Sequence, residues 1–510
     1  MINLTPLLRL YAKRRASELQ KLSTRERATD CQRQLLLSLV GKAAQTDFGK
    51  KHDFSSIRSI EDFQARVPLR SYEQFWDEYW KQPFPYLNNV TWPGLISNFA
   101  VSSGTSSGTT KYIPYTKGTK QGYTQAGLDM MIHHVLNRPQ SRLFSGKNFV
   151  LGGSTSLVEQ APGIFSGDIS GISVKSLPWW AKLRYFPPLE LTLLSDWEEK
   201  IEKYAQLSIH EHITGLSGVP SWMLILIERL FELKNAPSKR LVEVFPDLEL
   251  IVHGGVNFAP YIDQFTQLME GGHAELREVY PASEGFFAVA DRSYGQGMRL
   301  QIDGNVFFEF VPLEELDSDN PRRHTLANVE RDINYAVVLT TSAGLWSYII
   351  GDTISFVDLE PARILVTGRT SYYLSAFGEH LIADEVEDAV STAARSLNLS
   401  VRDFSVGARF PDESRTLGGH IFVVEFYNAN PSPEQLAQFG TAIEKRLCER
   451  NEDYEAHLAN GYGLERPEVR VVADGTFAEW MKSRGKLGGQ NKVPRIITKQ
   501  ELFDSLLSYT

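Results

Sequence analysis

The stretch SSGTSSGTTK, residues 102–111, follows the apolar run Phe99–Val101. It holds seven hydroxyl side chains, two glycines and one lysine. Glycine lets a backbone approach a ligand closely, and hydroxyl and backbone N–H groups donate to phosphate oxygens, to which Lys111 adds a positive charge. A surface loop can have the same composition, so this stretch alone leaves both a nucleotide site and a plain loop open.

The spacing of the two glycines does not fit the P-loop of nucleoside triphosphatases. That loop has four residues between its glycines and a Lys-Ser or Lys-Thr pair directly after the second. Here Gly104 and Gly108 enclose three residues, and Thr109 and Thr110 stand before Lys111. The sequence therefore disfavours a kinase or nucleoside triphosphatase that releases ADP.

The composition is that of a folded protein with large cores. Hydrophobic residues make up 42% of the 510-residue chain, which disfavours long disordered segments. The formal net charge of −9 argues against general nucleic-acid binding, which needs a basic surface. Two cysteines, Cys31 and Cys448, are too few for a disulfide framework or a metal cluster.

The N-terminal stretch is interrupted by Arg9 and Lys13 before a long apolar run forms, so it does not read as a signal peptide. No stretch approaches the roughly 18 apolar residues of a membrane span. We therefore expect a cytoplasmic protein that binds neither nucleic acid nor membrane.

The order of apolar runs predicts an α/β fold. Residues 5–46 and 59–80 show helical spacing, the second broken at Pro68. From about residue 97, short apolar runs end in Gly- and Ser-rich turns such as GGSTS, GLSGVPSW and HGGVNFAP. This strand–turn–helix rhythm is typical of β-sheets flanked by helices, with loops gathered at one sheet edge.

Two later segments complete the predicted architecture. Residues 305–358 hold β-rich runs separated by short turns, for which we expect a small β-barrel or an antiparallel sheet. The pattern changes again near Gly368 and Arg369 and then mixes helices with strands. We therefore expect a large N-terminal domain, residues 1–368, and a smaller α+β C-terminal domain, residues 369–510.

Three further segments favour the nucleotide site. VYPASEG, residues 279–285, offers an aromatic side chain for a base, a hydroxyl for a phosphate and, in Glu284, a carboxylate for Mg²⁺. SYIIGD, residues 347–352, places Asp352 at an expected strand end, where a carboxylate can accept both ribose hydroxyls. GGQNKVPR, residues 488–495, puts Lys492 in a Gly-rich loop. Each segment alone is weak evidence for a nucleotide site, but the order and spacing of all four motifs are unlikely to arise by chance.

In this order the segments resemble those of the adenylate-forming superfamily, which includes the acyl- and aryl-CoA ligases. SSGTSSGTTK, YPASE and YIIGD are similar to the three signature motifs of the auxin-responsive acyl-acid amido synthetases, the Gretchen Hagen family. TDFGKKHDF, EDFQARVPLRSYE, LELIVHGG and QNKVPR fit the same family, so the resemblance covers about residues 40–500. Plant members usually carry Arg where this chain has Ile349 and Ile350, and tend to carry Lys at Thr370. Because the chain is also shorter than typical plant members, we expect a bacterial member.

The resemblance implies an enzyme that uses ATP and Mg²⁺. Its substrates would be a small carboxylic acid, aromatic or auxin-like, and an amino acid. The acid is activated as an acyl-adenylate with release of pyrophosphate, and the amine then displaces AMP to form an amide. Two alternatives stay open: transfer of the acyl group to a thiol such as CoA, and a nucleotide- or acyl-binding relative without catalysis.

The resemblance also implies roles for individual residues of the ATP site. Residues that hold the phosphates would be Ser102, Ser103, Gly104, Thr105, Ser106, Ser107 and Lys111. Residues around the nucleoside and its α-phosphate would be Gly254, Gly255, Val256, Tyr280, Ser283 and Asp352. Glu284 would bind Mg²⁺, and Arg369 would sit at the hinge of a mobile C-terminal domain and approach ribose or phosphate.

Lys492 would complete the catalytic set with Glu284 and Lys111, and Lys486 is a nearby competitor for its role. The acyl pocket is assigned by resemblance to Trp179, Val219, Met223 and Phe286, although core packing accounts as well for any one of these side chains. We expect His253 and His380 to be turn histidines rather than general bases.

Overall fold

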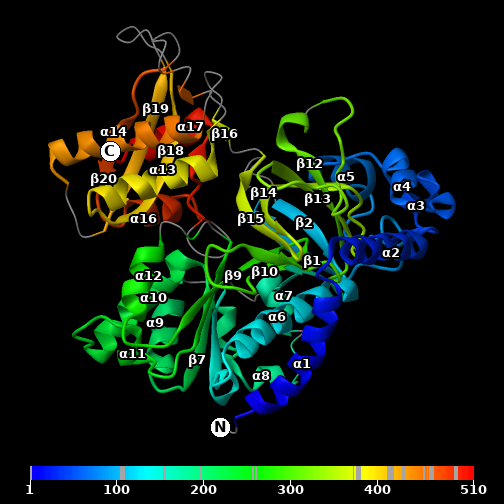
Figure 1. Cartoon of the computed structure of the whole chain (residues 1–510), viewed down its shortest axis with the longest axis horizontal. Helices are drawn as coiled ribbons and strands as arrows, with labels where there is room; N and C mark the ends of the chain where they lie inside the picture. The colour runs from blue at the N-terminus through cyan, green and yellow to red at the C-terminus, as the bar shows by residue number, and fades with distance from the viewer. Residues whose placement is uncertain are drawn as a thin grey trace. The chain divides into compact units, whose positions relative to one another are not determined.

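The chain forms two compact units in the computed structural model (Figure 1), which describes part of the sequence. The described residues are 3–103, 110–152, 157–175, 177, 179–194, 197–255, 258, 261–316, 318–370, 373–374, 381–410, 418–427, 431–451, 454–455, 458, 464–486 and 492–510. Unit 1 comprises residues 1–256 and 264–366, and unit 2 comprises residues 257–263 and 367–510. The domain boundary after residue 368 stays a prediction; the units divide after residue 366.

Unit 1 begins with a series of helices, several of which start at a capping Ser or Thr. They are α1 (Thr5–Lys21), α2 (Arg25–Ala43), α3 (Asp47–Lys51), α4 (Ile60–Arg66) and α5 (Tyr72–Phe75). Thr24 caps α2, and Ser59 and Ser71 form capping boxes at the starts of α4 and α5. The break predicted at Pro68 is confirmed, since α4 ends at Arg66.

These helices fix the chain next to a predicted motif. The rings of Phe48 and Phe54 lie 6.1 and 4.7 Å from the ring of Trp346, which is fully buried. The backbone N–H of Arg70 donates to Ser347 at 3.0 Å, and Ile349 donates back to Arg70 at 2.9 Å. The N-terminal helices thus hold the start of the SYIIGD segment in place.

A four-stranded sheet carries the SSGTSSGTTK stretch. Its strands are β1 (Asn98–Ser103), β2 (Thr110–Tyr115), β4 (Leu157–Ala161) and β5 (Ile164–Gly167), in the order β2-β1-β5-β4. β1 and β2 are antiparallel, with Ser102 opposite Lys111 and Ser103 opposite Thr110. The stretch therefore spans a hairpin, and its connection, residues 104–109, lies outside the described residues.

The large sheet of unit 1 has eleven strands in the order β12-β13-β14-β15-β11-β10-β9-β8-β7-β3-β6. Its parallel part consists of β3 (Lys147–Leu151), β6 (Tyr185–Phe186), β7 (Ile213–Gly218), β8 (Leu250–Gly254) and β9 (Glu275–Ala282). The carboxyl ends of parallel strands meet at one sheet edge, where α/β proteins bind ligands. The segments that follow β7, β8 and β9 start with Val219, Gly255 and Ser283, all predicted site residues.

The antiparallel part of the sheet includes residues 305–358, for which a small β-barrel or an antiparallel sheet was expected. It consists of β10 (Gly285–Val289), β11 (Met298–Leu300), β12 (Val306–Pro312), β13 (Asn334–Thr341), β14 (Tyr348–Leu359) and β15 (Ala362–Arg369). Among the described residues, a separate small β-barrel over residues 305–358 is not shown. β12 pairs antiparallel with β13, and β13 pairs antiparallel with β14. All three strands belong to the large sheet and continue it at one edge.

A second correction concerns Asp352, which was expected at a strand end. It lies inside β14, at an irregularity in the pairing with β13: Ile349 faces Val338 and Thr353 faces Ala336, so three residues of β14 oppose Val337 alone. Gly351 takes φ +90° there, a conformation that favours glycine. Such a bulge re-aims a side chain while the strand continues.

Helices cover both faces of the large sheet around β7 to β10. They are α6 (Lys117–Asn137), α7 (Ile169–Lys175), α8 (Trp179–Lys182), α9 (Trp197–Ser208), α10 (Pro220–Lys234), α11 (Leu241–Val244) and α12 (Ile262–Met269). α6 packs on β10 and against α1, while α10 packs on β7 and against α9. Figure 1 shows the two groups on opposite sides of the strands. The α/β fold with sheets flanked by helices is confirmed.

Unit 2 is a smaller α+β body. Its strands are β16 (Tyr373–Leu374), β17 (Leu381–Ile382), β18 (Val401–Arg409), β19 (Gly419–Phe426), β20 (Glu468–Val472) and β21 (Ile496–Ile497), the last four forming a sheet in the order β20-β19-β18-β21. Its helices are α13 (Ala383–Ser396), α14 (Pro433–Arg450), α16 (Thr476–Ser483) and α17 (Gln500–Leu507). Phe422 and Val424 pack with α13 and α14, whereas Ile421 and Val423 pack with α16 and α17. This alternation follows from the period of two in a strand.

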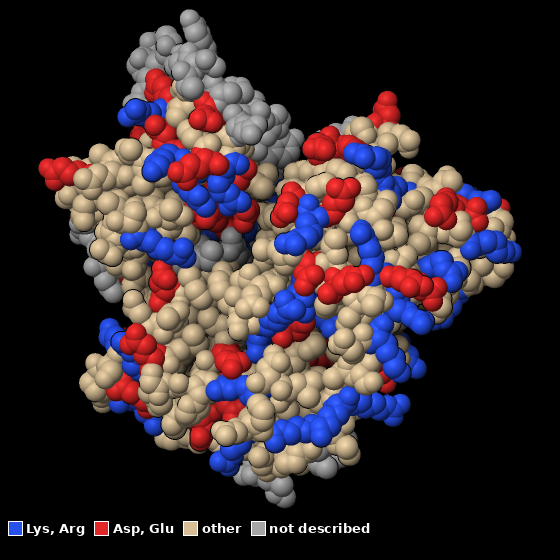
Figure 2. Space-filling model, in the orientation of Figure 1, with Lys and Arg blue, Asp and Glu red and all other residues tan. Residues whose placement is uncertain are grey.

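The charges of the molecule are mixed over the face drawn in Figure 2, where Lys and Arg side chains are interspersed with Asp and Glu. Within the described part of the chain, no helix is both long and apolar enough to cross a membrane.

Candidate active site

The predicted nucleoside residues of two distant segments meet directly. The Tyr280 hydroxyl, on β9, donates a hydrogen bond of 2.6 Å to Oδ2 of Asp352, on β14. Both residues are buried, at 7% and 8% exposure. A carboxylate has about four acceptor positions, so a carboxylate such as that of Asp352 can accept from several donors at once. The bulge in β14 and the end of β9 together make this contact.

Glu284 lies in the two-residue connection between β9 and β10, since Ala282 pairs with Gly285. Its Oε1 accepts a hydrogen bond of 3.1 Å from the Tyr348 hydroxyl, and the residue is 8% exposed. Burial raises the pKa of the Glu284 carboxyl, and the neighbouring Asp352 raises that pKa further, while Lys111 and Tyr348 lower it. Asp352 and Lys111 therefore both lie within electrostatic reach of Glu284.

Lys111 is held on the β2 side of this group. Its Nζ lies 4.0 Å from Oε1 of Glu73 and 5.3 Å from the ring centre of Tyr72. Tyr72 is in turn fixed by its hydroxyl, which accepts a hydrogen bond of 2.8 Å from the backbone N–H of Tyr112. A cation placed on an aromatic ring beside a carboxylate keeps its charge but has less freedom to move. Lys111 is thus poised to face an anionic ligand.

The loop after β8 requires its glycines. A Cβ on Gly254 would meet the carbonyl oxygen of Val279, on β9, at 2.3 Å, so no larger residue fits without a shift. Gly255 takes φ +81°, which other residues rarely adopt. Ser283 is buried, at 6% exposure, next to Glu284. Val256 lies outside the described residues.

The carboxylates of this group suit Mg²⁺ that arrives with a nucleotide. Among the described residues, no group of three or more His, Cys, Asp and Glu side chains could hold a metal ion. Mg²⁺ bound with a nucleotide uses one or two carboxylates, the phosphates and water rather than an all-protein cage. The buried Glu284 carboxylate, with Asp352 near it, fits that requirement.

The residues assigned to the acyl pocket stay predictions, and the structure describes three of the four in part. Val219 is the N-cap residue of α10, and Met223 in the first turn of that helix is fully buried, with its Cγ 3.2 Å from where a Cβ of Gly218 would lie. Phe286 is half-buried, and its ring meets the Tyr123 ring edge-on at 5.5 Å. Trp179 begins α8, and its side chain lies outside the described residues, as does His380.

Other predicted residues are not placed in this group. The side chains of Ser102 and Ser103 lie outside the described residues, as do Gly104, Thr105, Ser106 and Ser107. Arg369 and Lys492 belong to unit 2. The roles of these residues stay predictions.

The segment that carries Lys492 is anchored within unit 2. The Arg495 guanidinium donates to Oε1 of Glu387 at 3.0 Å and also pairs with Asp403. The Ser405 hydroxyl donates to the carbonyl of Pro494 at 2.7 Å. These bonds fix the chain two and three residues after Lys492 to β18.

His253 has the environment of a structural residue. It lies on β8 and is fully buried, and burial lowers the pKa of its imidazole to about 3. The ring is therefore neutral near pH 7, and no catalytic role is assigned to it.

The motifs missed several neighbours of the site. Tyr348 lies in the SYIIGD segment, four residues before Asp352 and on the same strand. This closeness to Asp352 was the signal that could have predicted a place for Tyr348 near the site. Tyr72 and Glu73 flank Lys111 but come from α5, about forty positions away in the sequence, so only the tertiary fold brings them there. Tyr123, on α6, was not singled out because nothing adjacent to it marks a site.

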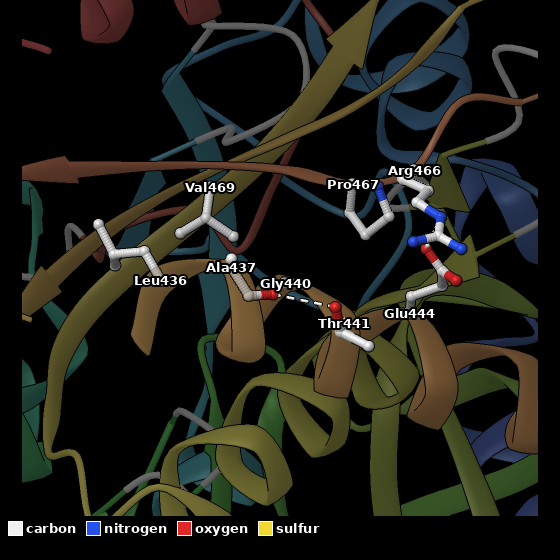
Figure 3. A pocket seen from close by; sticks show the side chains of 8 residues that line it. All are labelled: Leu436, Ala437, Gly440, Thr441, Glu444, Arg466, Pro467 and Val469. Carbon is white, nitrogen blue, oxygen red and sulfur yellow. Dashed lines mark hydrogen bonds and ion pairs between the residues drawn. The ribbon is translucent and has the colours of Figure 1, made fainter. Parts of the chain in front are cut away.

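A distinct cavity lies on unit 2 and is unrelated to these residues. It measures about 330 Å³ and is bordered by α14 and the segment around β20, with Arg466 and Glu444 paired at 3.5 Å on its rim (Figure 3). Its lining residues are Leu436, Ala437, Gly440, Thr441, Glu444, Arg466, Pro467 and Val469. It contains none of the predicted site residues.

Three parts of the chain match known family domains. Residues 17–273 match the GH3 family N-terminal domain, residues 300–369 the GH3 family central domain, and residues 384–501 the GH3 family C-terminal domain. The matches follow chain order, and the first alone covers half of the chain. The resemblance read from the motifs is confirmed, and the bacterial origin stays a prediction.

Two curated relatives show how far the similarity extends. The chain is 27% identical over 289 residues to the indole-3-acetic acid-amido synthetase GH3.3 of Arabidopsis thaliana, covering 52% of the chain and 47% of that protein. It is 22% identical over 551 residues to the indole-3-acetic acid-amido synthetase GH3.4 of Arabidopsis thaliana, covering 92% of the chain and 89% of that protein. The first alignment thus spans about half of the relative, and the second spans most of it.

Solved structures share the fold. The acyl acid amido synthetase AtGH3.15, in complex with 2,4-DB, superposes with a TM-score of 0.82 at 20% identity, covering 98% of this chain and 96% of that chain. A 2-hydroxyisobutyryl-CoA ligase in its postadenylation state superposes with a TM-score of 0.61 at 15% identity, covering 95% and 92%. At these identities the likeness concerns the fold, which is that of adenylate-forming ligases.

Proposed function

Because the chain belongs to the GH3 family, we propose that it is an ATP-dependent acyl-acid amido synthetase, a ligase that forms carbon–nitrogen bonds with release of AMP. The observation that carries this proposal is that Lys111, Glu284 and Asp352 come from three separate motifs and that the partly buried Lys111 and the buried Asp352 both act on the buried Glu284 carboxyl in unit 1. The lysine can neutralise charge on the phosphates of ATP, and the Glu284 carboxylate can hold the Mg²⁺ that accompanies them. The Asp352 carboxylate can accept hydrogen bonds from the ribose hydroxyls.

The reaction has two steps. First, a carboxylate oxygen of the acid attacks the α-phosphorus of ATP, an oxygen–phosphorus bond forms, and the bond to the β-phosphate oxygen breaks to release pyrophosphate. Second, the neutral amine of an amino acid attacks the carbonyl carbon of the acyl-adenylate, and the carbon–oxygen bond breaks to release AMP and a proton. The first step is needed because a free carboxylate has no good leaving group.

The residues contribute mainly by placing and neutralising charge, as in other phosphoryl-type transfers. Lys111 and the hydroxyl-rich stretch hold the phosphates, Asp352 accepts from the ribose, and Tyr280 orients Asp352 through its 2.6 Å hydrogen bond. Glu284 would hold Mg²⁺, which would supply positive charge at the phosphates. Lys492 and Arg369, both in unit 2, would serve the first step.

A second function has specific support. Transfer of the acyl group to a thiol such as CoA is the reaction named for the 2-hydroxyisobutyryl-CoA ligase that shares the fold. We favour the amine acceptor because the family domains match from residue 17 to residue 501. An auxin-like or other aromatic acid is the proposed acyl substrate class, after the names of the relatives.

The test is a panel of carboxylic acids screened for acid-dependent exchange of labelled pyrophosphate into ATP. Each acid that supports exchange is then incubated with amino acids and, separately, with CoA, and the products are identified by mass spectrometry. Amides with amino acids are expected. Thioesters alone would establish the second function, and an absence of exchange across the panel would contradict both.

A further inference from the structure

A network of buried polar side chains lies directly before Tyr348 in unit 1. It consists of Gln64, Glu309, Arg323 and Ser347, which we call the Ser347 network. Nε and Nη2 of Arg323 donate to the two carboxylate oxygens of Glu309, on β12, at 2.9 and 3.0 Å. Nη2 also donates to the Ser347 hydroxyl at 2.5 Å, and Nη1 donates to the carbonyls of Gln64 and Val67 at 3.0 and 2.7 Å. Arg323 thus uses the five N–H donors that a guanidinium has.

The Glu309 carboxylate is saturated in the same way. Besides the two bonds from Arg323, it accepts one of 2.9 Å from the Gln64 amide and one of 3.2 Å from the Ser347 hydroxyl. These bonds fill the roughly four acceptor positions of a carboxylate. The side chain of Glu309 is fully buried, and that of Arg323 is 9% exposed. A buried polar network with all its partners in place is rigid, so it fixes the position of Ser347.

Ser347 has an unusual backbone conformation. Its φ is +47°, a value that serine rarely adopts, and the residue is fully buried. Its N–H donates to the Thr340 hydroxyl at 3.0 Å, and its carbonyl accepts from the N–H of Arg70 at 3.0 Å. A residue in such a conformation persists where the surrounding structure holds it, and such residues cluster at active sites. The hydrogen bonds of Ser347, through both its backbone and its side chain, supply that hold.

The conformation of Ser347 decides where Tyr348 points. On one side of it, the Trp346 indole donates to the carbonyl of Thr91 at 2.9 Å and is fully buried. On the other side, the Tyr348 hydroxyl donates to Oε1 of Glu284 at 3.1 Å. Because the φ of Ser347 sets the direction of the chain between these two anchored side chains, it also sets the approach of the Tyr348 hydroxyl to Glu284.

The network also gives a place to the segment EDFQARVPLRSYE, residues 61–73, which the proposed function leaves without a role. Gln64 is a member of the network, and the backbone of Arg70 binds it. Tyr72 of the same segment holds β2 next to Lys111 through its hydroxyl, at 2.8 Å. The segment therefore supports the candidate site from two sides, at the strand of Lys111 and at the residue before Tyr348.

We propose that Glu309 and Arg323 are positioning residues for the adenylation step: through Ser347 they hold the Tyr348 hydroxyl on Glu284. This inference rests on the proposed function. The two residues act through Ser347 and Tyr348 rather than on the ligand. When the Ser347 hydroxyl is lost, its backbone is no longer held at a positive φ. Tyr348 then moves from Glu284, whose carboxylate loses a donor that orients it toward the phosphates and their Mg²⁺.

The test is a double-mutant cycle with the full-length protein in acid-dependent ATP–pyrophosphate exchange, at a pH on the acidic side of the optimum. Ser347→Ala removes the hydroxyl and keeps the Cβ. In otherwise wild-type protein it should lower kcat/KM for ATP roughly five- to tenfold, as expected for a lost hydrogen bond. In Tyr348→Phe, where the donor to Glu284 is already absent, Ser347→Ala should change kcat/KM by less than about twofold.

A second readout does not depend on turnover. MgATP binding raises Tm, and this rise should be smaller in Ser347→Ala than in wild type. In Tyr348→Phe the rise should be equally small with and without Ser347→Ala. The Tm measured without ligand reports the stability of each variant separately.

Conservative variants separate positioning from packing. Thr340→Val removes the acceptor of the Ser347 N–H and should reproduce the loss in kcat/KM, whereas Thr340→Ser keeps a hydroxyl there and should stay within about twofold of wild type. Ser208→Ala is the matched control. It removes another fully buried serine hydroxyl, on α9, which donates to the carbonyl of Ala205 at 3.1 Å. It should leave kcat/KM unchanged.

Equal losses from Ser347→Ala in wild type and in Tyr348→Phe would show that the network only stabilises the fold, and would refute the inference while the proposed function stands. A normal rate in Tyr348→Phe, or a Thr340→Ser as impaired as Thr340→Val, would refute it too. If Ser347→Ala does not fold, Thr340→Val takes its place in the cycle. An absence of exchange in the wild-type protein across the acid panel would contradict the proposed function itself, and the inference with it.

Discussion

The hydrogen bond from Tyr348 to Glu284 makes a specific prediction about pH. Tyr348→Phe removes a hydroxyl that lies 3.1 Å from the carboxylate and leaves a ring of nearly equal volume at a position with 1% exposure. The bond stabilises the ionised form, so its loss must raise the pKa of Glu284 further above its usual range. A hydrogen bond to a charged group contributes about 1.5–3 kcal/mol, so the loss of this bond should shift the titration of Glu284 measurably to higher pH.

The consequence for activity follows from the charge that Glu284 must carry. Only the ionised carboxylate suits Mg²⁺, so the rate of adenylation rises with pH through the pKa of Glu284. In Tyr348→Phe this acidic limb should move to higher pH, with near-normal rates at pH values above it. Asp352 on β14, Lys111 on β2 and Tyr123 on α6 also face this carboxylate and are unchanged by the substitution.

The assay is the pH profile of kcat/KM for ATP in the pyrophosphate-exchange reaction. Glu284→Gln is the companion variant, which should lose about 10²–10³ in rate at every pH because the charge is absent throughout. An acidic limb at the same pH in wild type and Tyr348→Phe would refute the reasoning. So would a loss that is uniform over pH, since that would make Tyr348 a packing residue only.

Three more predictions concern Asp352, Lys492 and Glu278. Asp352→Ala should raise the apparent KM for ATP with a smaller effect on the KM for the acid, and equal KM values for ATP in variant and wild type would remove Asp352 from the ribose. Lys492→Ala should slow acyl-adenylate formation by roughly 10² or more and affect amide formation from a presynthesised acyl-adenylate much less; equal effects, or a larger effect of Lys486→Ala, would reassign the role. Burial raises the pKa of Glu278 to about 7, so the folded state binds more protons than the unfolded state between about pH 4.5 and 7 and stability falls as pH rises through that window. Glu278→Gln should therefore raise Tm at pH 8 but not at pH 4, and an equal change at both would contradict the assignment.

Residues that are close in the sequence were sufficient to predict the helices and strands that they begin or end. Ser59 and Ser71 each begin a helix through a capping box, and Pro68 falls in the break between the two helices. The apolar runs that precede the Gly-rich turns are strands, including β3, β7 and β8. Such features depend on residues close in sequence, so pattern alone reveals them.

The pairing of strands that are distant in the sequence could not be predicted from the sequence pattern. Period-two patterns in residues 305–358 identified strands but not their neighbours, so a small barrel was expected where the strands extend the large sheet. The bulge at Gly351 was also missed, because it shows only when β14 is aligned with Val337 on β13. Segment 257–263 belongs to unit 2 although its flanks belong to unit 1, which no local pattern predicts.

The candidate site follows the same division. Glu284 and Asp352 were predicted from short motifs because carboxylates in those positions suit Mg²⁺ and ribose hydroxyls, and the fold places both beside Tyr side chains. Tyr348 was missed because an aromatic residue in a strand usually packs in a core, and only the fold shows that its hydroxyl binds Glu284. Tyr72 supports Lys111 from a separate helix, and no spacing rule connects the two.

The central claim is that a carboxylate of the substrate acid attacks the α-phosphorus of ATP. The most direct measurement uses an acid labelled with ¹⁸O in both carboxyl oxygens, incubated with the enzyme, ATP, Mg²⁺ and an amino acid, with the nucleotide product analysed by mass spectrometry. The account predicts AMP that carries one ¹⁸O atom in its phosphate and an amide that retains the other. ADP as the nucleotide product, or AMP without label, would contradict it.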